Sequence, residues 1–150
     1  MAGSFTKLVY HVVFSTKDRY PWMDASIRDE LFAFTAGVIR NLEGSQLQIG
    51  GMPDHLHLLV RLPASLPISH LLQTVKSNST RWLNERGQSR GRLSWQRGYG
   101  AFTVSESQVD VVDAYIRNQA EHHRTRSFEE EFRELLRKHH IEFDERFMLG

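Results

Sequence analysis

The stretch MPDHLHLLVRL, residues 52–62, decides the fold. Its Pro-Asp pair predicts a turn, and from His55 onward every second residue is apolar, which is typical of a β-strand with one buried face. The apolar positions are Leu56, Leu58, Val60 and Leu62. The two histidines, His55 and His57, therefore lie on the opposite face of the sheet, which we expect to be open.

This strand belongs to a predicted series of elements in the order β-α-β-β-α-β. The strands are expected at residues 6–15, 45–52, 55–62 and 99–105, and the long helices at residues 25–43 and 68–86. The order is that of an α+β, ferredoxin-like fold, in which an antiparallel sheet carries two helices on one face.

The ends of the helices are also predicted. Asp24 is expected to cap the first helix and Gly44 to end it. A third helix is expected to open with a capping box of Ser105 and Gln108 and to run to residue 123. A last amphipathic helix is expected over residues 128–139.

The composition is that of one globular domain over residues 1–150. Of the 150 residues, 40% are hydrophobic and 25% are charged, and the net charge is +1. The absence of cysteine excludes disulfides and thiolate chemistry and agrees with a cytoplasmic location. The N-terminal residues are not typical of a signal peptide and no apolar run is long enough to span a membrane, so we expect no membrane partner.

The two histidines suggest a metal site. Same-face neighbours on a strand lie about 7 Å apart, close enough for two imidazoles to converge on one ion. Two histidines leave a metal underfilled, so a third ligand is required. Structural histidines without chemistry would produce the same pattern.

Tyr115 and Gln119 lie four residues apart and are expected on one face of the third helix. The Gln119 carbonyl suits a hard cation, and Tyr115 is a candidate nucleophile if a metal polarises its target. A half-buried aromatic and a solvated amide would be the plain alternative.

Together these motifs resemble the single-tyrosine HUH transposases of the smallest bacterial insertion sequences (IS200-like transposases). HUH denotes two histidines around a bulky hydrophobic residue. The resemblance runs from YHVVFSTKDR and MPDHLHLLV to VKSNSTRWLNE, WQRGYGAFTVS and YIRNQAEHH. It implies that Tyr115 attacks a phosphate of single-stranded DNA, forming a 5′-phosphotyrosine link and a free 3′-OH. The DNA would carry hairpins near the ends of the element.

The resemblance also implies that His55, His57 and Gln119 hold Mg²⁺ or Mn²⁺. Zn²⁺ or Ni²⁺ would suit the same donors. No small-molecule cofactor is expected. His11 is expected beside the histidine pair as a supporting residue, His122 and His123 as helix-end residues, and His139 and His140 at the surface.

The middle of the chain is basic and carries two tryptophans, a composition typical of single-strand or hairpin binding. The expected DNA contacts are Lys76, Arg81, Arg90, Arg92 and Arg97. Trp82 and Trp95 are expected in the core. The edge strand, Tyr99–Ser105, carries no charge or proline, so two copies are expected to pair there as a homodimer. Whether Tyr115 serves its own site or that of the partner stays open.

Other functions fit parts of the pattern. The main alternative is a domesticated, non-mobile protein of the same fold that binds hairpin DNA. A metal-dependent hydrolase would use the histidines without Tyr115. A sheet-based RNA-binding module would carry exposed aromatics where this strand carries histidines. A replication or conjugation endonuclease would share the chemistry but is expected to carry further domains.

Overall fold

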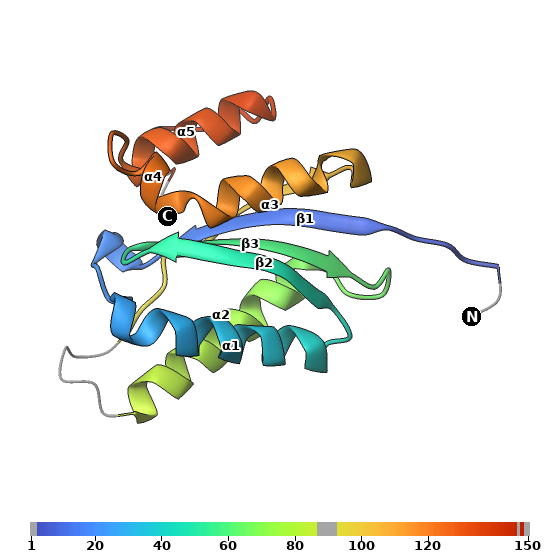
Figure 1. Ribbon diagram of the computed structural model, residues 1–150, viewed down its shortest axis with the longest axis horizontal. Helices are drawn as coiled ribbons and strands as arrows, with labels where there is room; N and C mark the ends of the chain where they lie inside the picture. Colours follow the sequence, from blue (N-terminus) through green and yellow to red (C-terminus); the bar gives the residue numbers. More distant parts are fainter. Residues whose placement is uncertain (1–2, 87–92, 147, 149–150) are drawn as a thin grey trace.

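The computed structural model describes residues 3–86, 93–146 and 148 and confirms the ferredoxin-like fold. A four-stranded antiparallel sheet has the order β2-β3-β1-β4, with β1 and β3 in the centre. Helices cover both faces (Figure 1). The elements are β1 Leu8–Ser15, η1 Lys17–Arg19, α1 Ala25–Asn41, β2 Ser45–Met52, β3 His55–Leu62, α2 Ile68–Glu85, β4 Gly100–Val104, η2 Glu106–Gln108, α3 Val109–Arg117, α4 Gln119–His122 and α5 Phe128–Lys138.

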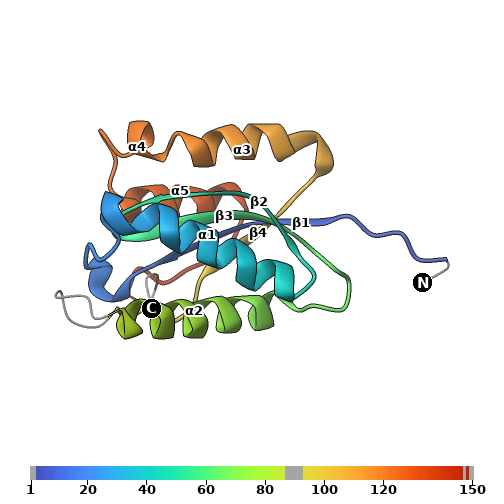
Figure 2. The same cartoon turned by 60° about the horizontal axis from the view of Figure 1, so that its bottom comes forward.

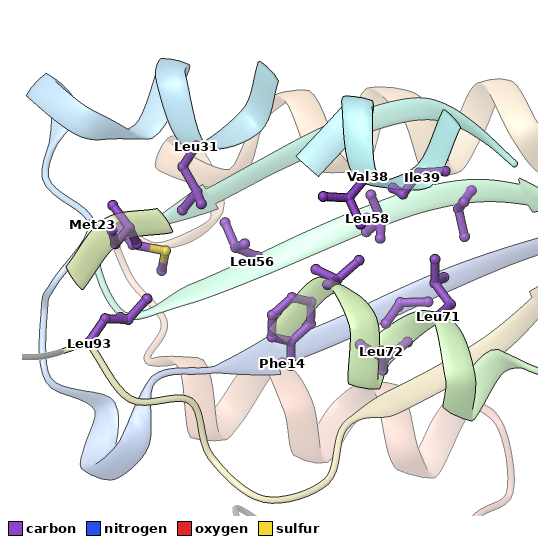
Figure 3. Packing of buried hydrophobic residues seen from close by; sticks show 14 of the residues in the cluster. Phe14, Met23, Leu31, Val38, Ile39, Leu56, Leu58, Leu71, Leu72 and Leu93 are labelled. Carbon is purple, nitrogen blue, oxygen red and sulfur yellow. The ribbon is translucent and has the colours of Figure 1, made fainter. Parts of the chain in front are cut away.

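The apolar face of β3 is buried against α1 and α2, as predicted. Even-numbered residues of β1 and β3 meet these two helices in the main core (Figure 3). The labelled core residues include Phe14, Leu56 and Leu58 from the sheet, Leu31, Val38 and Ile39 from α1, and Leu71 and Leu72 from α2. Trp82 and Trp95 are partly buried and pack against this core, as expected.

The ends of α1 confirm one prediction and correct another. Asp24 caps the helix, because its carboxylate accepts a hydrogen bond from the amide of Ser26 at 3.1 Å. The stop comes one residue before Gly44: Glu43 adopts the left-handed conformation with φ 65°. Gly44 instead allows a close approach, since a Cβ there would lie 3.2 Å from the Arg61 carbonyl oxygen.

The second face of the sheet is covered, contrary to the prediction that it is open. Helices α3, α4 and α5 lie over it, on the opposite side from α1 and α2 (Figures 1 and 2). Odd-numbered sheet residues pack against them in two further clusters: Val9 and Leu59 meet Ile116 of α3, and Val13 meets Phe128 and Phe132 of α5. The apolar residues of the C-terminal helices need burial, and this face of the sheet supplies it.

The predicted single helix after β4 is broken into parts. The short η2 helix precedes α3, and the Ser105 side chain contacts Ser107 rather than capping a helix, so the capping box is wrong. Asn118, with φ −99° and ψ 27°, separates α3 from α4. In the part of the chain that the structure describes, no helix is long and apolar enough to cross a membrane.

A glycine of β2 fixes how closely α3 approaches the sheet. A Cβ at Gly50 would lie 2.4 Å from the carbonyl oxygen of Ile116, which is backbone and cannot rotate away. The neighbouring contact is polar, since the Gln48 amide donates to Asp113 at 2.8 Å. These two contacts set the height of α3, and therefore of Tyr115, above the sheet.

We expect Gly50→Ala to lower the free energy of unfolding by about 1–3 kcal/mol, because the added methyl group overpacks the β2–α3 contact. Urea denaturation measures the change. The matched control is Gly37→Ala in α1, where the new Cβ would meet only an Arg40 nitrogen at 3.8 Å. That control should gain about 0.5–1 kcal/mol from helix propensity. Equal changes in the two variants would contradict the close approach.

Candidate active site

The two histidines of β3 converge on one point beneath the C-terminal helices. Both are fully buried, and the Nε2 atom of each points toward the same carboxylate, that of Glu131. The other ring nitrogen is anchored in each case: His55 Nδ1 lies 2.8 Å from Asp54 Oδ1, and His57 Nδ1 lies 2.8 Å from His11 Nε2. Outer partners of this kind fix the orientation of metal-binding imidazoles.

Glu131 of α5 is the centre of the site. Its Oε1 atom lies 3.0 Å from His57 Nε2, 3.0 Å from His123 Nε2 and 3.4 Å from His55 Nε2. Its Oε2 atom accepts hydrogen bonds from the Tyr115 hydroxyl and, at 2.9 Å, from the Gln119 amide. One fully buried carboxylate therefore joins the three histidines to Tyr115 and Gln119.

Tyr115 and Gln119 reach the histidines of their own chain. The carbonyl oxygen of Gln119 accepts from His55 Nε2 at 2.9 Å, and the Tyr115 ring lies edge-on to His57 at 5.7 Å between centroids. The rings of Tyr115 and His122 stack at 4.4 Å. The break at Asn118 leaves both predicted residues facing the site. In the structure, Tyr115 and Gln119 thus join the histidines within a single chain.

Burial and hydrogen bonding compete in setting the charges of the cluster. Burial alone would raise the pKa of Glu131, but hydrogen bonds from His123, His55 and His57 hold it far below its usual range, so the carboxylate is ionised. Burial would lower the pKa of His55, yet Asp54 and Glu131 outweigh it and raise the value to about 9. Burial lowers the pKa of His57, and that of His11 to about 3. His55 is therefore the cationic partner of Glu131.

The surroundings of Tyr115 keep its hydroxyl protonated. Burial raises the pKa of the phenol, and the nearby Glu131 charge raises it further. The hydrogen bond to Glu131 therefore orients the hydroxyl without ionising it. Reaction at this oxygen needs a group that stabilises the charge that develops as the proton leaves.

The donor atoms of the cluster fit a divalent metal ion. Ligand atoms of His55, His57 and Glu131 all lie within 4.8 Å of one another. Two imidazole nitrogens and one carboxylate oxygen are a common set for first-row divalent ions. Gln119 adds an amide oxygen beside His55. With the carboxylate oxygen of Glu131, the ligand set is a harder Lewis base than the neutral imidazoles and amide predicted from the sequence.

The predicted DNA contacts lie elsewhere. Lys76 and Arg81 belong to α2, on the sheet face opposite the cluster, and line a polar groove of about 800 Å³ with Trp95 and Gln96. The Lys76 ammonium donates to the carbonyl oxygens of Gln96 at 3.0 Å and Gly98 at 2.6 Å. Burial lowers its pKa to about 8. Arg97 is exposed, whereas Arg90 and Arg92 lie outside the described residues.

Sequence reasoning missed Glu131 and assigned His123 only to a helix end. A usable signal existed for Glu131: it lies three residues after Phe128 and one before Phe132, and so falls on the apolar face of α5. A carboxylate on a buried stripe requires partners. His11 is confirmed as a supporting residue. His139 is exposed, as expected, and stacks on Phe102.

The fold and the cluster together define a ferredoxin-like protein whose sheet carries two convergent histidines beside a tyrosine. The model of the family "Transposase IS200 like" matches residues 4–119, and the chain belongs to that family. Its activity is that of a transposase, an enzyme of DNA transposition. The family match ends at Gln119, so Glu131 lies beyond it.

Individual relatives agree with this assignment. The transposase for insertion sequence element IS200 of Salmonella typhimurium is 26% identical over 117 residues, which cover 75% of this chain and 76% of the relative; the same protein of Salmonella typhi matches equally. The crystal structure of a candidate transposase from Deinococcus radiodurans R1 superposes with a TM-score of 0.64 and 26% identity, covering 79% of this chain and 95% of the other. A REP-associated tyrosine transposase bound to a REP hairpin shares the fold, with a TM-score of 0.58, 15% identity and coverage of 79% and 70%.

We expect Glu131→Ala, measured in the presence of a chelator, to lower the free energy of unfolding by about 3 kcal/mol, because several buried polar groups lose their common partner. Glu134→Ala is the control from the same helix. Glu134 forms an exposed ion pair with Arg126, so its loss should cost less than about 1 kcal/mol. Similar losses in the two variants would contradict the central position of Glu131.

Proposed function

We propose that this transposase cuts and rejoins single-stranded DNA at the ends of an insertion sequence, with Tyr115 as the nucleophile. The observation that carries the proposal is the hydrogen bond from the Tyr115 hydroxyl into the buried cluster that also contains both histidines. The hydroxyl oxygen thereby lies beside the atoms that would hold a metal ion.

The bonds balance without an external energy source. The Tyr115 oxygen forms a bond to the phosphorus atom and loses its proton, while the bond from phosphorus to the 3′ oxygen breaks and that oxygen leaves as a 3′-OH. The resulting 5′-phosphotyrosine link retains the energy of the broken diester. Attack by a 3′-OH on this link reverses the step and joins two strands.

His55 and His57, together with Gln119 and Glu131, would hold the divalent ion, which we propose to be Mg²⁺ or Mn²⁺. Such an ion supplies Lewis-acid polarisation of the phosphate and stabilises developing negative charge. His11 and Asp54 hold the imidazoles in orientation, and Glu131 holds the Tyr115 hydroxyl beside them. The residues of the chain thus position the metal ligands and the nucleophile, and their burial limits the access of water.

Hairpin DNA is the proposed substrate, and the cytoplasm, where such DNA is present, the proposed location. The structural relative bound to a REP hairpin supports this choice. Arg81 and Arg97 are exposed and able to meet phosphates, whereas Lys76 must leave two carbonyl partners to do so. Arg90 and Arg92 keep the same proposed role from the sequence. We also propose that residues 1–150 act as one unit, because α5 supplies Glu131 to the site.

We expect a covalent protein–DNA adduct when the protein is incubated with Mn²⁺ or Mg²⁺ and single strands copied from the DNA that flanks the gene. A denaturing gel detects the adduct. Tyr115→Phe should abolish it, because the nucleophilic oxygen is removed. Tyr20→Phe, at a half-exposed tyrosine whose ring packs on Trp22, should retain it.

A second measurement, the binding of the metal ion, separates the role of the nucleophile from that of the metal ligands. By calorimetry with Mn²⁺, Tyr115→Phe should bind the ion, and His57→Ala should bind it at least about tenfold more weakly. Tight hairpin binding without an adduct would favour the domesticated protein. Neither binding nor an adduct, with both flanks tested, would contradict the proposal.

We further propose a homodimer through β4. Strand β4 lies at the sheet edge and pairs with β1 alone among the described strands. Sedimentation is expected to give twice the 17.5 kDa mass of one chain. Thr103→Lys places a charge on this edge and should yield monomers that retain the metal site, because one chain assembles it. Thr125→Lys, in the turn before α5, is the control; a monomeric wild type would refute the dimer.

A further inference from the structure

A second feature adjoins Tyr115: a cavity of about 430 Å³ between β4, α3 and α5. Tyr115 and His11 form its inner end, next to the buried cluster. Residues of α3 and α5 form its walls, and the end of β4 forms one side. A volume within the range of about 300–1,000 Å³ that is usual for ligand sites has room for one nucleoside.

Both apolar and polar residues line this cavity, and its surface is more apolar than polar. The apolar walls are Val104, Val111, Val112 and Leu135, and the polar groups are Thr103, Ser105, Gln108, Lys138 and His139. Val111 is 61% exposed, which is unusual for a valine and leaves an apolar surface at the rim. None of the described residues that line the cavity is acidic. The apolar part of this surface suits the face of a planar base.

A second cavity, lined mostly by charged residues, also adjoins Tyr115. It measures about 570 Å³ and is lined by Arg126, Glu131, Glu134, Arg137 and Lys138. Tyr115, Leu135 and Lys138 line both spaces, so Tyr115 lies in the wall between them. Four charged residues besides Lys138 line the second cavity, whereas Lys138 is the one Lys, Arg, Asp or Glu among the described residues that line the first.

We propose that the apolar cavity binds the base of the nucleotide adjoining the phosphate that Tyr115 attacks. This inference rests on the proposed function, because it needs a DNA strand at Tyr115. A base is tied through its sugar to that phosphate and must lie against the tyrosine. Lys138 at the boundary between the two cavities is placed to meet the adjoining phosphate. The protein would then select a base at the cut directly.

Gln108 is the residue placed to read this base. It precedes α3, its side chain is exposed, and the amide forms no hydrogen bond with another described side chain. A free carboxamide both donates and accepts, the capacity used for paired contacts to a base edge. The valines and Leu135 would hold the base by its faces, and Gln108 would discriminate among the four bases.

Binding is tested without cleavage in the Tyr115→Phe protein. Its valine methyl groups are followed by NMR during titration with the four homotrinucleotides of deoxyadenosine, deoxycytidine, deoxyguanosine and thymidine. The signals of Val104, Val111 and Val112 should shift and saturate, most tightly for one base, while Val38 on α1 stays unchanged. Shifts confined to other residues, or no shift with any trinucleotide, would overturn the base site.

Discrimination is tested with Gln108→Ala. The ratio between the tightest and weakest trinucleotide affinities should fall by about tenfold, the usual order for losing a paired base contact. Gln73→Ala, an exposed glutamine of α2 on the opposite face, should leave the ratio unchanged. An unchanged ratio in Gln108→Ala would overturn the role of Gln108 in base selection.

The two proposals fail in different ways. If trinucleotides bind at the valines but no strand forms an adduct with the wild type, the proposed function fails and the base site stands. If adducts form but the valine signals do not respond, the base site is wrong and the proposed function stands. An adduct that forms equally well with every base beside the cut would likewise contradict base selection.

Discussion

The buried carboxylate of Glu131 is the interaction on which the site depends. Its two oxygens face different partners: one faces His55, His57 and His123, and the other faces Tyr115 and Gln119. An ionised carboxylate in a dry interior is costly unless each lone pair finds a donor, so this arrangement is strongly constrained. The Glu131 carboxylate is stable only where the side chains that donate to it converge. This requirement determines the position of helix α5 on the sheet.

The apolar contacts position the same elements independently. Phe128 and Phe132 lie on either side of Glu131 in the sequence and pack on Val13, so hydrophobic burial delivers the carboxylate to the histidines. On α3, the close contact between Gly50 and Ile116 sets the height of Tyr115. Two helices that are separate in sequence thus bring Tyr115 and Glu131 together beside His57. In the structure, elements of one chain hold the whole cluster.

The fold was predictable because its signals are local. Strand alternation at residues 55–62, helix periodicity and the Asp24 cap each depend on near neighbours in the chain. The errors arose where distant parts meet. The open face predicted for His55 and His57 is covered because the apolar side chains of α5 pack on it. The end of the first helix was predicted at Gly44, but the residue with the left-handed conformation there is Glu43.

The sequence by itself determined the sheet, the histidine pair on one face of β3, and the spacing of Tyr115 and Gln119, because periodicity places side chains on faces. Membership of the transposase family agrees with those motifs. Only the tertiary structure decided that Glu131 and His123 join them, that one chain supplies the whole cluster, and that a cavity opens beside Tyr115. These properties depend on packing between segments many residues apart, and no local pattern encodes where such segments meet.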